Sequence, residues 1–220
     1  MSLTMVQERF LELLVRRQAL RFGSFQLKSG RTSPYYINTG CFHSAQDLGA
    51  LGFCYASGLR EHFGDDIGLI FGPAYKGIPL ALATAQTYQE MVGHDVDWAF
   101  DRKEAKDHGD SGSFVGAPLA DRDLVIVDDV LTAGTALRQA ISAVQAVGGR
   151  VRGALISVDR MERGRGNGRA RDEIAAEYGV PVHALIGIRE AADHLLAHPV
   201  AGEHYLDTAT HTRIIEHIGA

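Results

Sequence analysis

This 220-residue sequence contains only two cysteines, which are too few for a disulfide framework. Cys41 and Cys54 lie too far apart for a redox or zinc motif, and no nearby residue completes a ligand set. The ten histidines show no metal-ligand spacing either. We therefore expect two reduced, partly buried thiols and no zinc site.

Long apolar runs and an excess of positive charge are also missing. No stretch approaches the length of a transmembrane helix, and the N-terminus has no signal-peptide core, so we expect a cytoplasmic protein. The 22 Lys and Arg residues against 27 Asp and Glu residues give a net charge of −5, which argues against general binding to nucleic acid or to anionic membranes. The length suits one domain spanning residues 1–220.

What the sequence does contain is one stretch around which the rest can be arranged. Leu124–Val127 is short, apolar and β-branched, which predicts a buried parallel strand. Two carboxylates follow, Asp128 and Asp129, and then a turn of small residues at 132–135 that leads into an amphipathic helix near 136–147. Backbone N–H groups at such a helix start attract anions, and threonine hydroxyls add donors. The stretch therefore predicts a phosphate site.

The acid pair beside this turn narrows the choice of ligand. A phosphorylated ribose fits, because its 5′-phosphate suits the turn and its hydroxyls can donate to the acids. The G-x-x-x-x-G-K-[ST] pattern of nucleoside triphosphate sites does not occur. The alternative is a strand, turn and helix whose acids only cap the helix. The stretch resembles the phosphoribosyl pyrophosphate (PRPP) motif of the type I phosphoribosyltransferases.

A second strand, turn and helix comes earlier in the chain. Ile67–Phe71 predicts a buried strand, Gly72-Pro-Ala-Tyr-Lys-Gly77 follows it directly, and a helix is expected near 78–91. Lys76 supplies the positive charge that the acidic turn lacks. The alternative is a Pro/Gly loop shaped only for the crossover. Two phosphate-binding turns on one sheet suit PRPP, whose phosphate and diphosphate groups lie at opposite ends.

Residues 101–113 are charged and contain little that could be buried. A mixed charge run is usually a solvated surface. Here four basic groups gather beside glycines, namely Arg102, Lys103, Lys106 and His108. This clustering predicts a mobile loop, near 103–114, that closes over a polyanion.

The remaining segments define the fold class. Apolar residues from Leu3 to Leu20 recur at helical spacing, and residues 22–38 predict a small antiparallel pair of strands outside the main sheet. Together they form an N-terminal helix and hood over about 1–45. The core, about 46–220, begins with a helix near 46–63 and continues with strands at 151–158 and 182–187 around a helix near 171–178. This alternation predicts an α/β protein with a parallel sheet flanked by helices.

Five segments together resemble the bacterial orotate phosphoribosyltransferases. In chain order they are Lys28-Ser-Gly-Arg with Ser33-Pro-Tyr-Tyr, Phe71-Gly-Pro-Ala-Tyr-Lys-Gly77, Arg102-Lys-Glu-Ala-Lys-Asp-His-Gly109, Val127-Asp-Asp-Val-Leu-Thr-Ala-Gly-Thr135 and Asp159-Arg-Met-Glu-Arg-Gly164. The match spans about residues 8–190, which is more specific than any single motif. Ile37 stands where we expect an aromatic residue, and the loop 164–171 is unusually rich in Gly and Arg. The resemblance implies the type I phosphoribosyltransferase fold with a small hood.

The resemblance also implies a reaction, a cofactor and a set of residues. Ribose 5-phosphate would pass from PRPP to N1 of orotate, giving orotidine 5′-monophosphate and diphosphate in the biosynthesis of UMP, with Mg²⁺ as cofactor and no protein metal ligand assigned. The residues implied for PRPP are Tyr75, Lys76, Arg102, Lys103, Lys106, His108, Asp128, Asp129, Val130, Leu131, Thr132, Ala133, Gly134, Thr135 and Ala136. Those implied for orotate are Lys28, Tyr36, Ile37, Thr132 and Arg160. The catalytic roles would fall to Lys106, His108, Asp128 and Asp129.

A homodimer is implied as well, in which the charged loop reaches the active site of the other subunit. Two other readings of the motifs exist. A PRPP-sensing regulator would need a basic face or a DNA-binding unit, and this acidic chain shows neither. A purine or uracil phosphoribosyltransferase is disfavoured by the signature at 102–109 and by Arg160. We expect no nucleic-acid or membrane partner.

Overall fold

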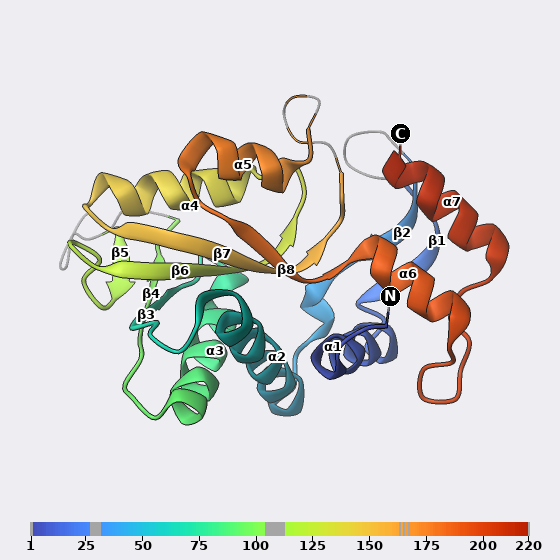
Figure 1. Ribbon diagram of the computed structural model, residues 1–220, viewed down its shortest axis with the longest axis horizontal. Helices are drawn as coiled ribbons and strands as arrows, with labels where there is room; N and C mark the ends of the chain where they lie inside the picture. The colour runs from blue at the N-terminus through green and yellow to red at the C-terminus, as the bar shows by residue number, and fades with distance from the viewer. Residues whose placement is uncertain are drawn as a thin grey trace.

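A computed structural model describes residues 2–26, 32–103, 113–162, 164, 166 and 168–219. There, a six-stranded sheet with the order β5-β4-β3-β6-β7-β8 lies between two layers of helices, beside a two-stranded sheet, β1-β2 (Figure 1). The strands are β1 (Leu20–Gln26), β2 (Thr32–Ile37), β3 (Leu69–Phe71), β4 (Asp97–Asp101), β5 (Phe114–Gly116), β6 (Asp123–Leu131), β7 (Arg150–Asp159) and β8 (Val182–Gly187). The helices are α1 (Met5–Arg16), η1 (Thr39–Cys41), α2 (Ala45–Phe63), α3 (Gly77–Val92), α4 (Thr135–Ala146), α5 (Ala170–Tyr178), α6 (Ile188–Ala197) and α7 (Thr208–Gly219).

The central strand β6 shows why the sheet is covered on both faces. Successive side chains of a strand point to opposite faces. Val125 and Val127 belong to one hydrophobic cluster, with residues of α1, α2 and α3. Leu124 and Ile126 belong to a second cluster, with residues of α4 and α5. In Figure 1 the same two groups of helices lie on opposite sides of the sheet. The predicted α/β architecture is confirmed.

The N-terminal hood is built from both ends of the chain. β1 and β2 pair antiparallel, with Leu20 opposite Ile37, as predicted for the small strand pair. Helix α7 lies against β2, where the rings of Tyr35 and His217 meet edge to face with centroids 5.8 Å apart (Figure 1). The last thirty residues gave no usable sequence signal, so the contribution of α7 to the hood was not predicted.

The structure corrects the predicted elements at several points. Leu20 begins β1 and is not part of the N-terminal helix, which ends at Arg16. Strand β6 does not end at Val127, because its ladder with β7 continues to Leu131. β4 and β5 were not predicted, and β5 runs antiparallel to β4, so the described sheet is not wholly parallel. The acid pair therefore lies within a strand rather than after it.

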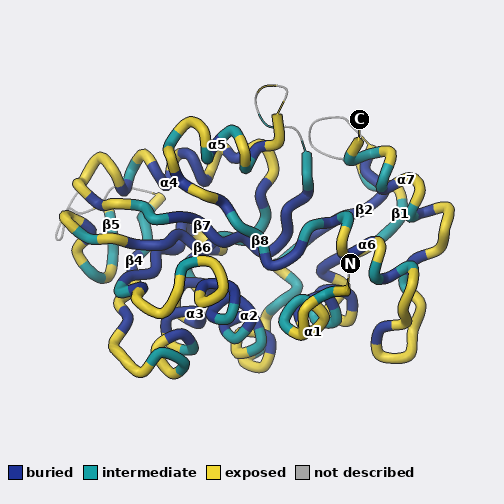
Figure 2. The backbone as a smooth tube through the Cα atoms, viewed as in Figure 1, coloured by how far each residue is buried: buried dark blue, intermediate teal, exposed yellow. Residues whose placement is uncertain are grey.

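Burial follows this layered arrangement. The strands of the large sheet are mostly buried, and the helices expose their outer faces (Figure 2). Cys54 is buried and Cys41 is partly exposed, and both are free thiols, as predicted. Among the described residues, no helix combines the length and the apolar character needed to cross a membrane.

Candidate active site

The site is built where three neighbouring parallel strands end. β3, β6 and β7 lie side by side in the sheet, and the acid pair belongs to the carboxyl-terminal part of β6. Lys76 and Arg160 follow the carboxyl ends of β3 and β7. Ligands of open α/β sheets bind outside the carboxyl ends of the strands. A groove of about 410 Å³ opens there, between the loop after β3, the acid pair of β6 and the first turns of α4. Its lining includes Tyr75, Lys76, Lys103, Asp128, Asp129 and Ala136. Six residues predicted for the site therefore share one groove.

Asp129 is the centre of the polar contacts in this groove. Its Oδ2 atom accepts hydrogen bonds from Lys76 Nζ at 2.8 Å and from Thr39 Oγ1 at 2.9 Å. Thr39 lies in η1, which joins the hood to α2. The contact therefore links the strand that carries the acids to the segment that leaves the hood. Nothing in the sequence around Thr39 indicated this role.

Side chains of α2 and β7 form hydrogen bonds with the backbone of the acid pair. Tyr55 Oη, on α2, donates to the carbonyl oxygen of Asp128 at 2.7 Å. Ser157 Oγ, on β7, donates to the carbonyl oxygen of Asp129. Asp128 Oδ1 in turn accepts from the backbone N–H of Asp129 at 2.8 Å. A fully buried tyrosine and a buried serine thus fix the direction in which both carboxylates leave the strand.

The surroundings of Asp128 change its pKa. Burial raises the pKa of Asp128 to about 7, and the neighbouring charge of Asp129 adds to the shift. The backbone N–H of Asp129 and the charges of Lys76 and Lys103 oppose it. The carboxyl group of Asp128 therefore ionises near neutral pH.

This shift has a consequence for stability that can be measured. A raised pKa in the folded state gives stability that is fully present below the unfolded pKa of about 4 and is lost as pH rises through about 7. Asn mimics the protonated acid, so Asp128→Asn should be more stable than wild type at pH 8, by about 1–3 kcal/mol, and equally stable at pH 4. Urea unfolding at both pH values checks this. An equal difference at both would contradict it.

The turn after β6 has the backbone geometry that an anion site needs. Gly134 has φ +77° and comes directly before α4, whose start receives no side-chain cap. This left-handed conformation favours glycine, and a Cβ atom at Gly134 would also press on Ile174 Cδ1, 2.7 Å away. Thr132, Ala133, Thr135 and Ala136 are exposed. The helix N-terminus therefore faces solvent with small residues and hydroxyls around it, which suits a phosphate group.

Arg138 braces this turn from inside the protein, and its role was missed at the sequence level. Its Nη1 atom donates to the carbonyl oxygen of Ala133 at 2.7 Å, and its side chain is only 4% exposed. Nη2 donates to Glu173 at 3.1 Å and Nε donates to Glu177 at 2.8 Å, both on α5. The sequence showed only an arginine in an amphipathic helix, because both partners lie in a distant segment.

The turn after β3 is equally tight. A Cβ atom at Gly72 would lie 2.0 Å from the carbonyl oxygen of Gly77, so only glycine fits there. The backbone N–H of Ala74 donates to Asp101 Oδ1, at the end of β4, at 2.6 Å. The peptide bond between Ala74 and Tyr75 is cis, and the Tyr75 side chain is largely exposed. The loop thus places Tyr75 and Lys76 on the rim of the groove.

Of the residues predicted to bind orotate, Arg160 follows the end of β7, and Tyr36 and Ile37 lie in the hood. Arg160 is buried beside Tyr35, its guanidinium carbon 4.9 Å from the centre of the ring. Tyr36 is half-buried, with its ring centroid 5.5 Å from that of Phe25. Ile37 is buried in the main core cluster. The hood strand therefore brings an arginine and aromatic rings close together.

Lys28, Lys106 and His108 lie outside the described residues. Arg102 and Lys103 lie at the end of β4, and the N–H of Arg102 donates to the carbonyl oxygen of Ser113 at 2.8 Å. Val130 and Leu131 belong to β6 and direct the chain into the turn.

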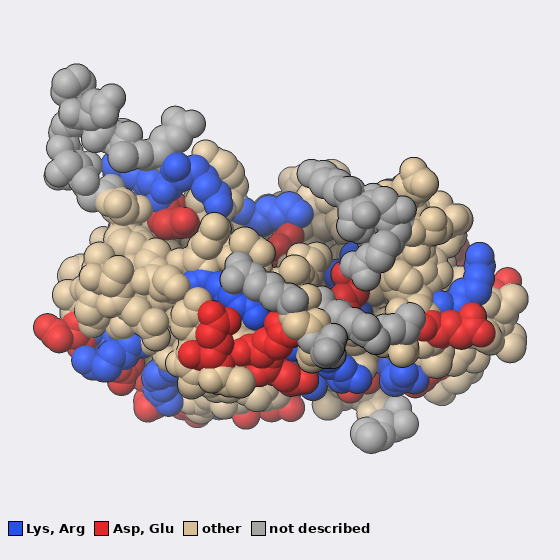
Figure 3. Space-filling view, turned by 90° about the horizontal axis from the view of Figure 1, so that it is seen from above, with Lys and Arg blue, Asp and Glu red and all other residues tan. Residues whose placement is uncertain are grey.

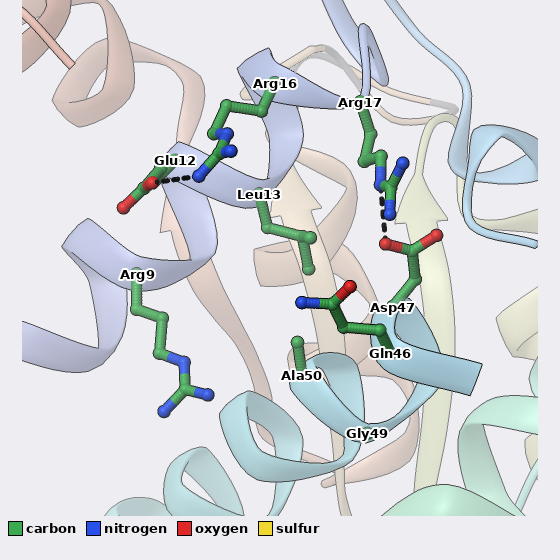
Figure 4. Close-up of a pocket in the computed structure, with 9 residues that line it drawn as sticks. All are labelled: Arg9, Glu12, Leu13, Arg16, Arg17, Gln46, Asp47, Gly49 and Ala50. Atoms are coloured by element: carbon green, nitrogen blue, oxygen red, sulfur yellow. Dashed lines mark hydrogen bonds and ion pairs between the residues drawn. The ribbon is translucent and has the colours of Figure 1, made fainter. Parts of the chain in front are cut away.

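A larger groove, of about 560 Å³, lies between α1 and α2, away from these turns (Figure 4). Arg16 Nη1 pairs with Glu12 at 2.9 Å, and Arg17 Nε pairs with the buried Asp47 at 2.6 Å. Arg9 stacks over the ring of Phe53 at 4.5 Å. Because two of its three arginines are already neutralised, this groove is a weaker candidate for a polyanion.

On the face shown in Figure 3, basic side chains gather along the upper left and acidic side chains gather near the centre.

Fold and turns together define the class of protein. The model of the phosphoribosyl transferase domain family matches residues 50–167, a segment that contains both turns and the acid pair. The function of the family is transfer of a phosphoribosyl group, which agrees with a groove that can hold a phosphate, ribose hydroxyls and a second anion.

Similar proteins specify the family further. The orotate phosphoribosyltransferase of Cronobacter sakazakii is 46% identical over 198 residues, covering 90% of this chain and 92% of that protein. The enzyme of the same name from Marinobacter nauticus is 45% identical over 205 residues, covering 93% and 95%. The crystal structure of orotate phosphoribosyltransferase from Francisella tularensis has a TM-score of 0.80 at 31% identity, covering 94% and 96%. The chain belongs to the orotate phosphoribosyltransferase family.

Proposed function

We propose that this protein transfers ribose 5-phosphate from PRPP to N1 of orotate, giving orotidine 5′-monophosphate and diphosphate in pyrimidine biosynthesis. The observation that carries the proposal is the shared groove, in which the loop after β3 and the acid pair of β6 face each other beside the phosphate turn. Such a groove matches a ligand that has ribose hydroxyls between two anionic groups.

The roles in PRPP binding follow from the groove. The turn at 132–136, braced by Arg138, would bind the 5′-phosphate through N–H groups and hydroxyls. Asp128 and Asp129 would accept hydrogen bonds from the ribose hydroxyls. Tyr75, Lys76, Arg102 and Lys103, on the opposite side, would surround the diphosphate. Lys106 and His108 would complete this set from the charged loop.

Chemistry at C1′ explains this division of charge. The bond from C1′ to the diphosphate oxygen breaks as the bond to N1 of orotate forms, and N1 gives up its proton to the leaving diphosphate or to water. Positive charge develops on the ribose and negative charge on the leaving diphosphate. Fixed cations beside the diphosphate stabilise that negative charge, and carboxylates beside the ribose stabilise the positive charge. Lys76 pairs with Asp129 at 2.8 Å and must leave this carboxylate to reach the diphosphate.

The residues of the groove suit an Mg²⁺ ion that is bound partly by the protein and partly by the phosphates of the substrate. Among the described residues, no three His, Cys, Asp or Glu side chains converge on one point, so the protein offers no complete metal cage. Mg²⁺ is commonly bound through one or two carboxylates together with substrate phosphates. Asp128 and Asp129 would hold it, and when bound it would neutralise charge on the diphosphate.

Orotate differs from uracil by a carboxylate, and Arg160 is the group that suits this difference. It lies at the end of β7 beside Tyr35 of the hood. Tyr36, Ile37, Thr132 and Lys28 would complete the base pocket.

Arg160→Leu should therefore weaken the binding of orotate and leave the binding of PRPP nearly unchanged. Loss of a hydrogen-bonded charge pair costs about 1.5–3 kcal/mol, which is about a 10- to 100-fold rise in KM for orotate. The KM for PRPP should stay within about twofold, because the phosphate turns are separate from this side chain. Steady-state kinetics with each substrate varied in turn measures both. An unchanged KM for orotate would exclude the role.

A two-fold dimer with shared active sites is part of the proposal. β4 and β5 pair antiparallel, with Asp101 opposite Phe114, so both ends of the charged loop start from one edge of the sheet. We propose that the loop reaches the active site of a second subunit, and that each site takes Lys106 and His108 from the partner.

A panel of bases assayed with PRPP and Mg²⁺ tests the proposed function. Orotate should be converted to orotidine 5′-monophosphate, with little or no product from uracil, hypoxanthine or adenine. Product from hypoxanthine or uracil, and none from orotate, would overturn the assignment. PRPP binding without any transfer would favour a PRPP-sensing regulator.

A further inference from the structure

Arg160 is held by a carboxylate that has no assigned role. Arg160 Nε and Nη2 both donate to Glu162 Oε1, at 2.8 Å and 2.6 Å. The two side chains are 6% and 10% exposed, so the pair is nearly buried. A buried charge pair of this kind is costly to form unless its geometry is good. The pair therefore holds the guanidinium group of Arg160 in one orientation.

The backbone between the two residues is shaped for the pairing. Met161 has φ +55°, an uncommon value for a residue other than glycine. Its N–H donates to Asp159 Oδ1 at 2.8 Å, and Asp159 Oδ2 also lies 3.3 Å from Arg171 Nη1. This turn brings Glu162 back against the residue two places before it.

Tyr35 restrains the arginine from another direction. Its ring lies 4.9 Å from the guanidinium carbon, and its hydroxyl donates to the carbonyl oxygen of Arg160 at 3.1 Å. Tyr35 is fully buried. The guanidinium plane is thus fixed by an aromatic ring from the hood and by Glu162 from its own turn.

The donor geometry of arginine shows what this arrangement leaves available. A guanidinium has five N–H donors, and one edge is formed by Nε and Nη2. Glu162 accepts from that edge through a single oxygen. The edge formed by Nη1 and Nη2 is the second one that can bind a carboxylate bidentately.

We propose that Glu162 is a positioning residue, which holds the Nε/Nη2 edge of Arg160 so that the Nη1/Nη2 edge is presented to the carboxylate of the base substrate. The inference rests on the proposed function, since it assumes that Arg160 meets orotate. Glu162 itself does not touch the substrate. Its effect is on the fraction of protein in which Arg160 is correctly oriented, and so on orotate recognition rather than on PRPP.

Three variants of Glu162 test this role. Glu162→Ala removes the acceptor, and we expect KM for orotate to rise about tenfold with little change in KM for PRPP. Glu162→Gln keeps an acceptor oxygen at nearly the same place, so it should restore KM to within about threefold of wild type. Glu162→Asp keeps the charge but withdraws the oxygen by one methylene, so it should behave like alanine, and it carries the test if the alanine variant does not fold.

Binding of orotate compared with its neutral carboxamide adds a readout that a purely structural role would not move. The preference for orotate should fall about tenfold in Glu162→Ala and Glu162→Asp and persist in Glu162→Gln. In an Arg160→Leu background, Glu162→Ala should cause no further loss. Asp123→Ala is the matched control, because Asp123 pairs with Arg150 at the opposite end of β7. It should leave the preference unchanged.

The outcomes are distinct. If wild type does not use orotate, the proposed function fails before Glu162 is tested. If wild type uses orotate and Glu162→Ala keeps a normal KM, the positioning role is wrong. A lower KM in Glu162→Ala would show that Glu162 competes with the substrate for Arg160, which would also overturn the proposal.

Discussion

Changing Asp129 to asparagine should lower kcat/KM for PRPP by about 10²- to 10³-fold. Asp129 Oδ2 accepts hydrogen bonds from Lys76 and Thr39, so its charge is directed into the groove. In the proposed complex the same carboxylate meets a ribose hydroxyl and Mg²⁺. Two charge-assisted contacts of about 1.5–3 kcal/mol each would be weakened by the neutral amide. The loss should appear in PRPP binding and in turnover, with orotate binding little affected.

Asp123→Asn provides a matched control for this experiment. Asp123 begins the same strand, β6, and pairs with Arg150 at its far end. Both variants exchange a carboxylate for an amide, so any common effect reports on folding. Kinetics at saturating orotate and limiting Mg²⁺, together with thermal unfolding of each variant, separates an effect on activity from an effect on folding. Full activity of both Asp128→Asn and Asp129→Asn would show that the acid pair serves only the fold.

Lys106→Ala should slow turnover by about 10²- to 10³-fold, the scale for losing a group that stabilises charge in the transition state. Lys106 lies outside the described residues, and its role rests on the resemblance of the charged loop to the family. Thermal stability should be unchanged, since a charged residue in such a loop has little apolar surface to bury. A variant with normal kcat would remove Lys106 from the proposed mechanism.

Mixing of two inactive variants tests whether the site is shared. Lys106→Ala and Arg160→Leu chains should each form weakly active dimers. In a mixed dimer with shared sites, one site collects both substitutions and the other collects neither. Random reassortment makes half of the dimers mixed, so activity should return to about a quarter of wild type. Co-expression with two different tags allows purified mixed dimers to be assayed. If these remain inactive, each site is built from a single chain.

The parts of the molecule that sequence alone predicted are those encoded within one segment. The strand, acid pair and small turn at 124–136 were predicted together, because apolar run, carboxylates and glycine are contiguous. The same holds for the loop after β3. The strand end at Val127 was placed too early, because two charged residues normally signal a loop. Here the ladder to β7 continues past them, with Asp128 opposite Ile156.

What the sequence could not show are contacts between distant segments. Tyr55 looked like one apolar position of α2, yet its hydroxyl fixes the backbone of Asp128, which lies 73 residues later. Arg138 looked like a surface charge of a helix, yet it is buried between the phosphate turn and α5. β4 and β5 are short, and β4 begins and ends with an aspartate, so their local pattern is weak. Tertiary contacts decide such cases, and single-segment patterns do not record them.

The packing of α7 against β2 bears on how the protein is made. The hood strands leave the ribosome early, whereas α7, whose His217 meets Tyr35, follows the whole core in the chain. Tyr35 is also the ring behind Arg160. During synthesis the sheet and both phosphate turns can therefore form while the wall behind Arg160 is still incomplete. We expect a nascent chain that stalls before α7 to form the groove for PRPP but not the complete pocket for orotate.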